Sequence, residues 1–282
     1  GRGLSQAIQT VSFTFDQPVD HGSAQSKFSI SSGTVRGFSW KGNTMYVSVS
    51  DLGYQQTVTA RVEAGVANAG FGLPSATFYT HSFTTETRSV RLNVPHFRQQ
   101  HSATCSAASL RMALAYRGVG SDEMCLVRAM GYAPRDRQGD VWDDSGVMFV
   151  GSVDGSIAAG TGAGPDAPPI AKAARSYGRS VQDFSGISAG WIAQQIYNGN
   201  PVLMFGAYKP TGTTSWKTPS GGTIVINLTG HVTVVTGVVG EPSSPIGFWV
   251  NDPLGGGGVY WSAGAVAANI ARDPGRQAVV VY

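Results

Sequence analysis

Hydrophobic and polar residues alternate in short runs along the first ninety residues. Val11, Phe13 and Phe15, for example, are separated by polar neighbours. Further alternating runs cover residues 45–49, 57–62 and 76–83. A period of two is typical of half-buried β-strands, and turn residues separate the runs about every eight to twelve positions, as in a β-sandwich. Because no window here has helical periodicity, the pattern predicts an all-β first unit.

The pattern changes after a short polar junction, Glu86-Thr87-Arg88-Ser89, where we place a domain boundary between 1–88 and 89–282. Apolar residues at helical spacing predict helices at 105–116, 121–131, 169–177 and 188–197. Thr104 is the expected N-cap of the first helix. Apolar runs predict strands at 201–207, 223–228, 231–239, 247–251 and 277–282. This order favours an α+β domain with a helical lobe and an antiparallel sheet.

Composition narrows the class of protein. The 282 residues include 20 Lys and Arg against 17 Asp and Glu, a net charge of +3, which is too small for a typical nucleic-acid binder. Hydrophobic residues make up 41% of the chain, enough for a sizeable core. No apolar run reaches the roughly 18 residues of a membrane helix, so we expect no membrane span in this chain. The polar start GRGLSQAIQT favours a processed end or a cloning remnant over a signal peptide.

The two cysteines, Cys105 and Cys125, are too few for a disulfide scaffold. If the first two predicted helices form an antiparallel hairpin, Cys105 lies about 18 Å from the connecting turn, at ~1.5 Å of rise per residue. Cys125 lies near that turn, so the two thiols are too far apart for a bridge, which needs Cα atoms within about 7 Å. Asp122 and Glu123 disfavour a thiolate at Cys125, which we interpret as a structural thiol.

Cys105 has the setting of a nucleophile. It falls in the first turn of its predicted helix, where unpaired N–H groups and the helix dipole favour a thiolate. Acyl transfer also needs a base and donors for the oxyanion. Gln99, six residues upstream, is close enough to fold back and donate its amide N–H, and the backbone N–H of Cys105 is the second expected donor.

The base has to be one of five histidines. His21 and His81 belong to the β unit, and His96 and His101 lie in the loop that leads to Cys105. His231 instead begins the apolar strand HVTVVTGVV, where an imidazole has few structural reasons to occur. Asp252 follows the strand FWVN and is expected to accept the Nδ1–H of His231, which fixes the tautomer.

Three other motifs favour structural interpretations. Gly186-Ile187-Ser188-Ala189-Gly190 matches a nucleophile elbow, but no acid lies between Ser188 and the histidine downstream, so we predict that Ser188 is a helix N-cap. Asp140, Asp143, Asp144 and Asp154 fit no calcium loop and are interpreted as solvated acids. The glycines at 255–258 lack the lysine of a phosphate loop, and we interpret them as a flexible turn.

Residues 8–86 resemble a bacterial Ig-like module of the kind found in S-layer and other cell-surface proteins. The resemblance is carried, in order, by VSFTFDQPVDHGSAQSKFSI, FSWKGNTMYVSVS, TVTARVEAGVANAGFG and HSFTTE. It implies a seven-strand sandwich that acts as a spacer or adhesion module, with a cell-wall or surface partner.

Residues 91–282 are similar to papain-like cysteine peptidases of the bacteriocin-processing (double-glycine-leader) group. The matching segments are LNVPHFRQ, TCSAASLRMALAYRG, FVGSVDG, GNPVLMF, SWKTPSG, GHVTVVTGV and VNDPLGG. The resemblance implies Cys105 as nucleophile, His231 as base, Asp252 as its orienting residue and Gln99 as oxyanion donor. Many relatives have Cys-Gly-Pro-Ala-Ser where this chain has Cys-Ser-Ala-Ala-Ser, a departure that reshapes the groove.

The sequence therefore predicts a secreted or surface-tethered bacterial hydrolase: an Ig-like sandwich followed by a papain-like thiol protease. Its substrate is expected to be a peptide or protein, and the chemistry requires no metal or organic cofactor. Two alternatives stay open. One is an amidase or transpeptidase that acts on cell-wall peptides through the same acyl-enzyme. The other is a non-catalytic surface adhesin whose papain-like domain only binds.

Overall fold

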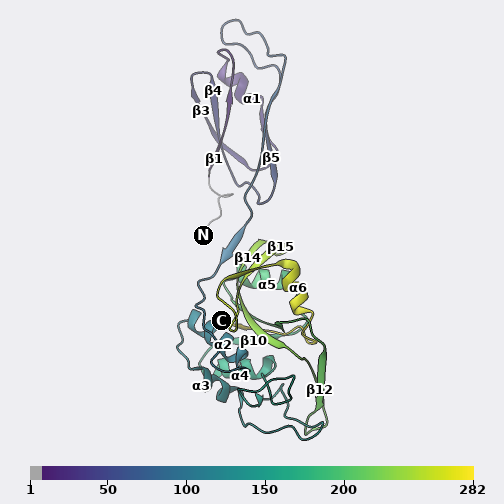
Figure 1. Ribbon diagram of the computed structural model, residues 1–282. Coiled ribbons are helices and arrows are strands. Elements are labelled where there is room, and N and C mark those ends of the chain that lie inside the picture. The colour runs from purple at the N-terminus through teal and green to yellow at the C-terminus, as the bar shows by residue number, and fades with distance from the viewer. Residues whose placement is uncertain (1–7) are drawn as a thin grey trace. The chain divides into compact units, whose positions relative to one another are not determined.

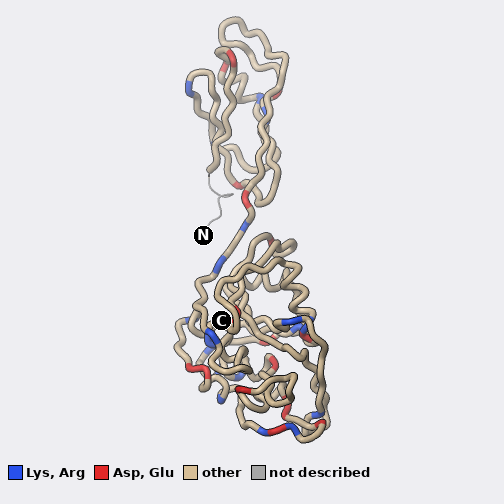
Figure 2. The backbone as a smooth tube through the Cα atoms, viewed as in Figure 1, with Lys and Arg blue, Asp and Glu red and all other residues tan. Residues whose placement is uncertain are grey.

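The computed structural model describes residues 8–282, and the chain divides into two compact units between Arg88 and Ser89 (Figure 1). Residues 1–7, which hold most of the expected processed end, lie outside the described residues. Basic and acidic side chains occur in both units, and within residues 8–282 they form no long run of one sign (Figure 2). Charged residues are few and both signs are mixed along the chain, in agreement with its small net charge.

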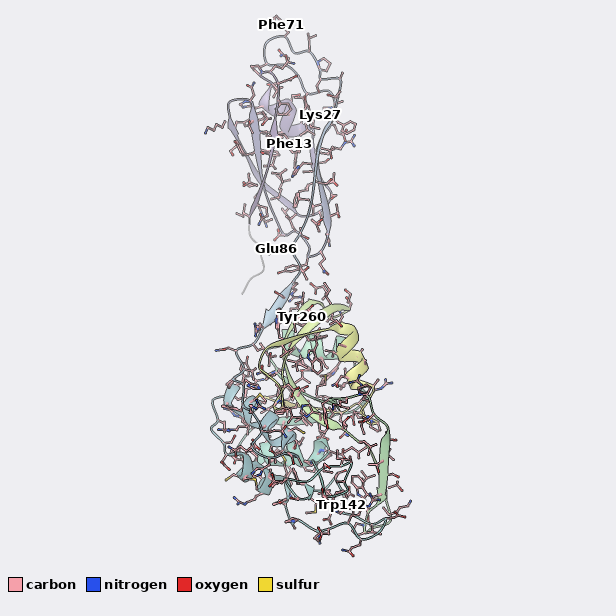
Figure 3. The ribbon with its side chains drawn as sticks, viewed as in Figure 1. Phe13, Lys27, Phe71, Glu86, Trp142 and Tyr260 are labelled. Carbon is pink, nitrogen blue, oxygen red and sulfur yellow. The ribbon has the colours of Figure 1, made fainter. Side chains whose placement is uncertain are left out.

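The first unit is a β-sandwich of two antiparallel sheets. One sheet has the order β1 (Gln9–Thr14), β4 (Thr44–Ser50), β3 (Thr34–Lys41), and the other has the order β2 (Phe28–Ile30), β5 (Thr57–Val62), β6 (Tyr79–Thr84). Both sheets contribute to one core, for example Val11 and Phe13 from β1, Met45 from β4 and Val58 from β5 (Figure 3 labels Phe13). The alternating pattern predicts these strands because side chains of β1, β4 and β5 are buried at every second position.

The prediction that this unit contains no helix is wrong. Helix α1 (His21–Ser26) follows Asp20, whose carboxylate accepts the N–H of Ser23 at 2.6 Å. Of its six residues only Ala24 is buried, so no apolar period marks the helix in the sequence. Within residues 8–88 the sandwich has six strands, whereas the Ig-like resemblance implies seven.

The second unit is built around a mainly apolar antiparallel sheet. Its strands follow the order β10 (Val181–Phe184), β17 (Ala278–Val281), β11 (Val202–Ala207), β14 (Gly230–Glu241), β15 (Ser244–Asn251), β16 (Val259–Ser262), and β7 (Ser89–Arg91) also pairs with β14. Two smaller ladders are β12 (Thr213–Lys217) with β13 (Thr223–Asn227), and β8 (Val150–Gly151) with β9 (Gly162–Ala163). The strands predicted from apolar runs are confirmed as β11, β13, β14, β15 and β17, whereas the other strands of this unit are not predicted.

Helices cover both faces of the large sheet. α2 (Cys105–Tyr116), α3 (Glu123–Met130) and α4 (Ala167–Ser176) pack on one face, and α5 (Ala189–Tyr197) and α6 (Ala263–Ile270) on the other. Strand β11 sends Leu203 and Phe205 to the first face and Val202 and Met204 to the second. A strand buried on both faces is a continuous apolar run, which explains its sequence. The helices therefore do not form one lobe beside the sheet, and α6 was not predicted.

Two features of the helices bear on the predictions. The hydroxyl of Ser188 accepts the N–H of Trp191 at 3.2 Å, which confirms Ser188 as the N-cap of α5. In residues 8–282 no helix is both long enough and apolar enough to cross a membrane.

Candidate active site

Cys105 is the first residue of α2 and is only 9% exposed. One turn further along the helix, the hydroxyl of Ser109 donates to the carbonyl of Val232 at 3.0 Å. Val232 is the neighbour of His231 in β14. This buried bond fixes the position of α2 along β14, so it sets the distance between the candidate nucleophile and the strand that carries the candidate base.

The start of α2 has no side-chain cap. Thr104 occupies the N-cap position as predicted, but its hydroxyl contacts the carboxylate of Glu123 at 2.5 Å and the carbonyl of His101 at 3.0 Å. The first N–H groups of a helix have no acceptor within the helix, and here no capping side chain accepts them. The N-terminus of α2 therefore presents donors and a positive dipole end beside Cys105.

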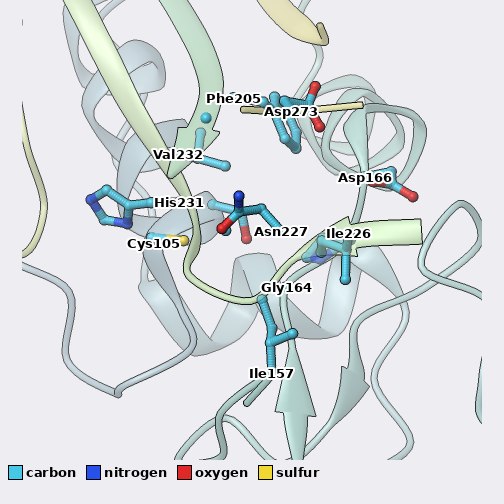
Figure 4. A pocket seen from close by; sticks show the side chains of 14 residues that line it. Cys105, Ile157, Gly164, Asp166, Phe205, Ile226, Asn227, His231, Val232 and Asp273 are labelled. Carbon is cyan, nitrogen blue, oxygen red and sulfur yellow. The ribbon is translucent and has the colours of Figure 1, made fainter. Parts of the chain in front are cut away.

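His231 and Asp252 meet because their strands are antiparallel neighbours in the sheet. His231 is near the start of β14, and Asp252 directly follows the end of β15. The His231 Nε2 lies 2.7 Å from the Asp252 Oδ1. The expectation that Nδ1 faces the carboxylate is wrong, and Nδ1 is left for Cys105, with which the ring forms a hydrogen bond. Figure 4 shows the imidazole beside the Cys105 sulfur.

The charges at these groups are strongly coupled. Burial by itself would lower the pKa of His231, which is 6% exposed, but the hydrogen bonds to Asp252 and Cys105 outweigh it and raise the pKa from 6.5 to about 9. Burial would likewise raise the pKa of Asp252, but the hydrogen bond from His231 and its charge lower it below 3.8. At neutral pH the pair is therefore an imidazolium held by a carboxylate.

The glycine-rich segment after β15 holds Asp252 in place. The Leu254 N–H donates to the Asp252 Oδ1 at 2.8 Å, and the Asp252 N–H donates to the Gly256 carbonyl at 3.0 Å. A ring nitrogen of His96 lies 2.8 Å from the Asp252 carbonyl oxygen. A Cβ on Gly257 would lie 2.8 Å from the His96 Cβ. The segment 255–258 forms the expected turn, and its glycines allow tight packing here.

The side chain of Gln99 is not oriented toward an oxyanion beside Cys105, as predicted, but toward its own loop. Its Nε2 donates to the carbonyls of His101 and Ser102 at 2.7 and 2.9 Å, so both amide hydrogens are used within the loop before α2. Its Oε1 is buried without a hydrogen-bond partner. The side chain therefore braces the loop and does not offer a free donor to Cys105.

The remaining histidine and cysteine candidates lie elsewhere. His101 pairs with the exposed carboxylate of Asp154 at 3.0 Å. His21 and His81 belong to the first unit, as expected. Both cysteines are free, which confirms the absence of a bridge, and Cys125 is exposed at the surface of α3.

A groove of about 780 Å³ opens over the candidate nucleophile and base. Its walls come from the segments around Gly155 and Gly164 and from the start of β14. Tyr208 also lines the groove, with its ring edge-on to His231 at 6.0 Å between ring centroids. Sequence reasoning gave these wall residues no role because they come from segments far apart in the chain, although Gly155 ends the matching segment FVGSVDG.

Comparison with known proteins identifies the family of the second unit. A sequence profile of the Peptidase C39-like family matches residues 91–271. The uncharacterized protein YvpB of Bacillus subtilis (strain 168) is 32% identical over 155 residues, which cover 54% of this chain and 58% of YvpB. The chain thus spans less than two thirds of that relative.

Solved structures are also similar. A Bacillus anthracis protein assigned as a C39-like peptidase has a TM-score of 0.59 at 23% identity, over 69% of this chain and 98% of that one. A double glycine motif protease from an AMS/PCAT transporter, crystallised with the leader peptide, has a TM-score of 0.41 at 17% identity, over 68% and 93%. The first of these shows a shared fold, and the family profile covers more than half of the chain. The chain therefore belongs to the Peptidase C39-like family.

Proposed function

We propose that the chain hydrolyses peptide bonds through a triad of Cys105, His231 and Asp252. One observation carries the proposal. The His231 ring forms a hydrogen bond of 2.7 Å with Asp252 through Nε2 and also hydrogen-bonds Cys105. An imidazolium beside a cysteine stabilises the thiolate, which is the reactive form of the nucleophile. A pKa of about 9 for His231 keeps that charge in place at neutral pH.

The acylation step follows from this geometry. The Cys105 thiolate attacks the carbonyl carbon of the scissile bond, and a C–S bond forms as the carbonyl oxygen becomes an oxyanion. His231 then gives its Nδ1 proton to the leaving amine as the C–N bond breaks. Asp252 stays ionised throughout and holds the ring through Nε2. Water attacks the thioester in the second half-reaction, with neutral His231 as the base, and releases the acid.

The oxyanion is placed at the uncapped start of α2. The Cys105 N–H is a donor that supports this assignment, and the positive end of the helix dipole favours the negative charge. We give Gln99 the role of bracing the loop before α2, since its two amide hydrogens are bound to carbonyls there. An amidase or transpeptidase would share the same acylation step and differ only in the acceptor of the acyl group.

We also propose an extracellular or cell-surface setting, with the first unit as an Ig-like spacer or adhesion module. Its two packed sheets support the sandwich assignment, and it carries no residue of the triad. Phe71, on a loop of the sandwich, is 87% exposed and is the first residue to test for contact with a surface partner (Figure 3). Fractionation of the producing cells would test the setting, and recovery only in the cytosol would contradict it.

The two cysteines supply the experiment for the enzymatic proposal. Cys105→Ala should remove hydrolysis of a peptide library completely, because the only other thiol of the chain, Cys125, lies on α3 outside the site. Cys125→Ser should keep kcat/KM within about twofold, since Cys125 is exposed on α3 and lies outside the site. Hydrolysis that survives in Cys105→Ala, measured by mass spectrometry of the products, would contradict the assignment of the nucleophile.

A further inference from the structure

Beside the triad lies a narrow pocket of about 430 Å³, including its open mouth. Cys105 and His231 form one side of it (Figure 4). Phe205, Ile226 and Val232 give it apolar walls. Asp166 and Asp273 lie away from the thiol in Figure 4. A ligand that enters from the thiol would therefore pass apolar side chains before it reaches two carboxylates.

The two carboxylates have no cationic partner among the described residues. Asp273, 8% exposed, accepts the N–H of Gln277 at 2.6 Å, and Asp166 accepts from Gln277 Nε2 at 3.1 Å and from Ser145 at 2.7 Å. Burial and then the negative charge of Asp166 raise the pKa of Asp273. The positive charge of His231, at the other side, is already bound by Asp252. The pocket thus concentrates negative charge.

A third acceptor in the pocket is unused. The hydroxyl of Ser106 is buried, with the residue 1% exposed, and it has no hydrogen-bond partner. It lines the pocket and would lie 3.5 Å from a Cβ on Gly164, another lining residue. Such groups are normally paired inside proteins, so an orphan in a pocket indicates a missing ligand.

Resting on the function proposed above, we propose that this pocket is a specificity subsite for a primary ammonium on an aliphatic stem, as in a lysine at the last or second-last residue before the scissile bond. The stem packs against Phe205 and Val232. An ammonium has three hydrogens to donate, and a carboxylate has about four lone-pair sites, so Asp166 and Asp273 can accept further bonds beside those from Gln277 and Ser145. Asp166, Asp273 and Ser106 then supply one acceptor for each hydrogen.

Peptidyl chloromethyl ketones test the subsite without a known substrate. The thiolate of Cys105 displaces chloride from them and forms a C–S bond. Two matched pairs are compared, acetyl-Gly-Lys with acetyl-Gly-norleucine and acetyl-Lys-Gly with acetyl-norleucine-Gly, in the Cys125→Ser background. Norleucine keeps the stem and lacks the charge. At one of the two positions, lysine should raise the second-order inactivation rate at least about tenfold.

Variants of the pocket residues then show which side chains cause the preference for lysine over norleucine. Asp166→Asn and Asp273→Asn should each reduce the lysine to norleucine ratio to about threefold or less, and Ser106→Ala should reduce it by a smaller factor. Asp140→Asn, which removes a surface charge in the same unit, should leave the ratio unchanged. The iodoacetamide rate of each variant checks that Cys105 itself is intact.

The outcomes separate the two proposals. Equal rates for lysine and norleucine at both positions would overturn the subsite, and so would a lysine preference that persists in both aspartate variants. The wild-type comparison decides the question even where a variant does not fold. If Cys105 reacts with neither iodoacetamide nor any of the ketones, the catalytic proposal itself fails.

Discussion

Helices α2 and α3 both carry a cysteine close to their first turn, and their N-termini are built in opposite ways. At α3 the carboxylate of Asp122 accepts the N–H of Cys125 at 3.0 Å, so the chain caps this helix with its own negative charge. That hydrogen bond lowers the pKa of Asp122 below 3.8. At α2 the expected cap, Thr104, turns to Glu123 and leaves the helix end open.

The difference shows which of the two helix N-termini already has a negative group bound to it. A helix N-terminus favours an anion, and α3 satisfies this with an aspartate that lowers the free energy of the folded state. In the proposed mechanism the open end of α2 is instead left for the negative charge that develops during the reaction, in a buried setting beside His231.

The largest expected effect concerns the residue that orients the base. Asp252→Ala should lower kcat/KM by about 10²–10⁴-fold, because His231 loses both its tautomer control and the charge that stabilises the imidazolium. Asp154→Ala is the matched control, since it removes the other histidine–aspartate contact, that with the partly exposed His101. It should change kcat/KM by less than about twofold. Equal losses in the two variants would mean that Asp252 has only a structural role.

A smaller effect is expected at the loop before α2. Gln99→Ala should lower kcat about tenfold through loss of the two carbonyl contacts, less than the 10²–10³-fold typical of a lost oxyanion donor. Gln99→Glu should be worse than Gln99→Ala, because a carboxylate cannot donate to the His101 and Ser102 carbonyls. A loss of kcat above 10²-fold in Gln99→Ala would contradict the bracing role and indicate that Gln99 donates to the oxyanion.

The smallest effect on catalysis is expected at the capped helix. Asp122→Ala should lower the melting temperature by a few degrees, because the Cys125 N–H loses its acceptor. Catalysis at α2 should be untouched, with kcat/KM within about twofold of the parent. Thermal unfolding followed by circular dichroism, together with steady-state assays, measures both quantities. A loss of activity without a loss of stability would show that the two helix ends are not independent.

The sequence predicted the elements that have strong, long patterns. Apolar runs predicted β11 and β14 because both strands are buried on two faces. The polar residues His231, near the start of β14, and Asp252, directly after β15, stood out beside such runs. The helices α1 and α6 were not predicted because neither segment shows a clear apolar period. The structure thus adds elements at positions where local patterns are weak.

The fine geometry of the site could not be predicted for a different reason. Which ring nitrogen faces Asp252 depends on how β14 and β15 are aligned, and the turn of Thr104 toward Glu123 depends on how α3 packs. Asp166 and Asp273 lie in the same pocket although 106 positions separate them in the sequence. Such contacts arise only from tertiary packing.

The central claim is that His231 is an imidazolium held between Cys105 and Asp252 at neutral pH. Nitrogen-15 NMR of the imidazole, recorded against pH, measures this directly. We expect the ring to lose its proton near pH 9 in the parent and at a lower pH in Cys105→Ser, since Cys105 contributes to the raised pKa. Titration of His231 near 6.5 in the parent, unchanged in Cys105→Ser, would contradict the account.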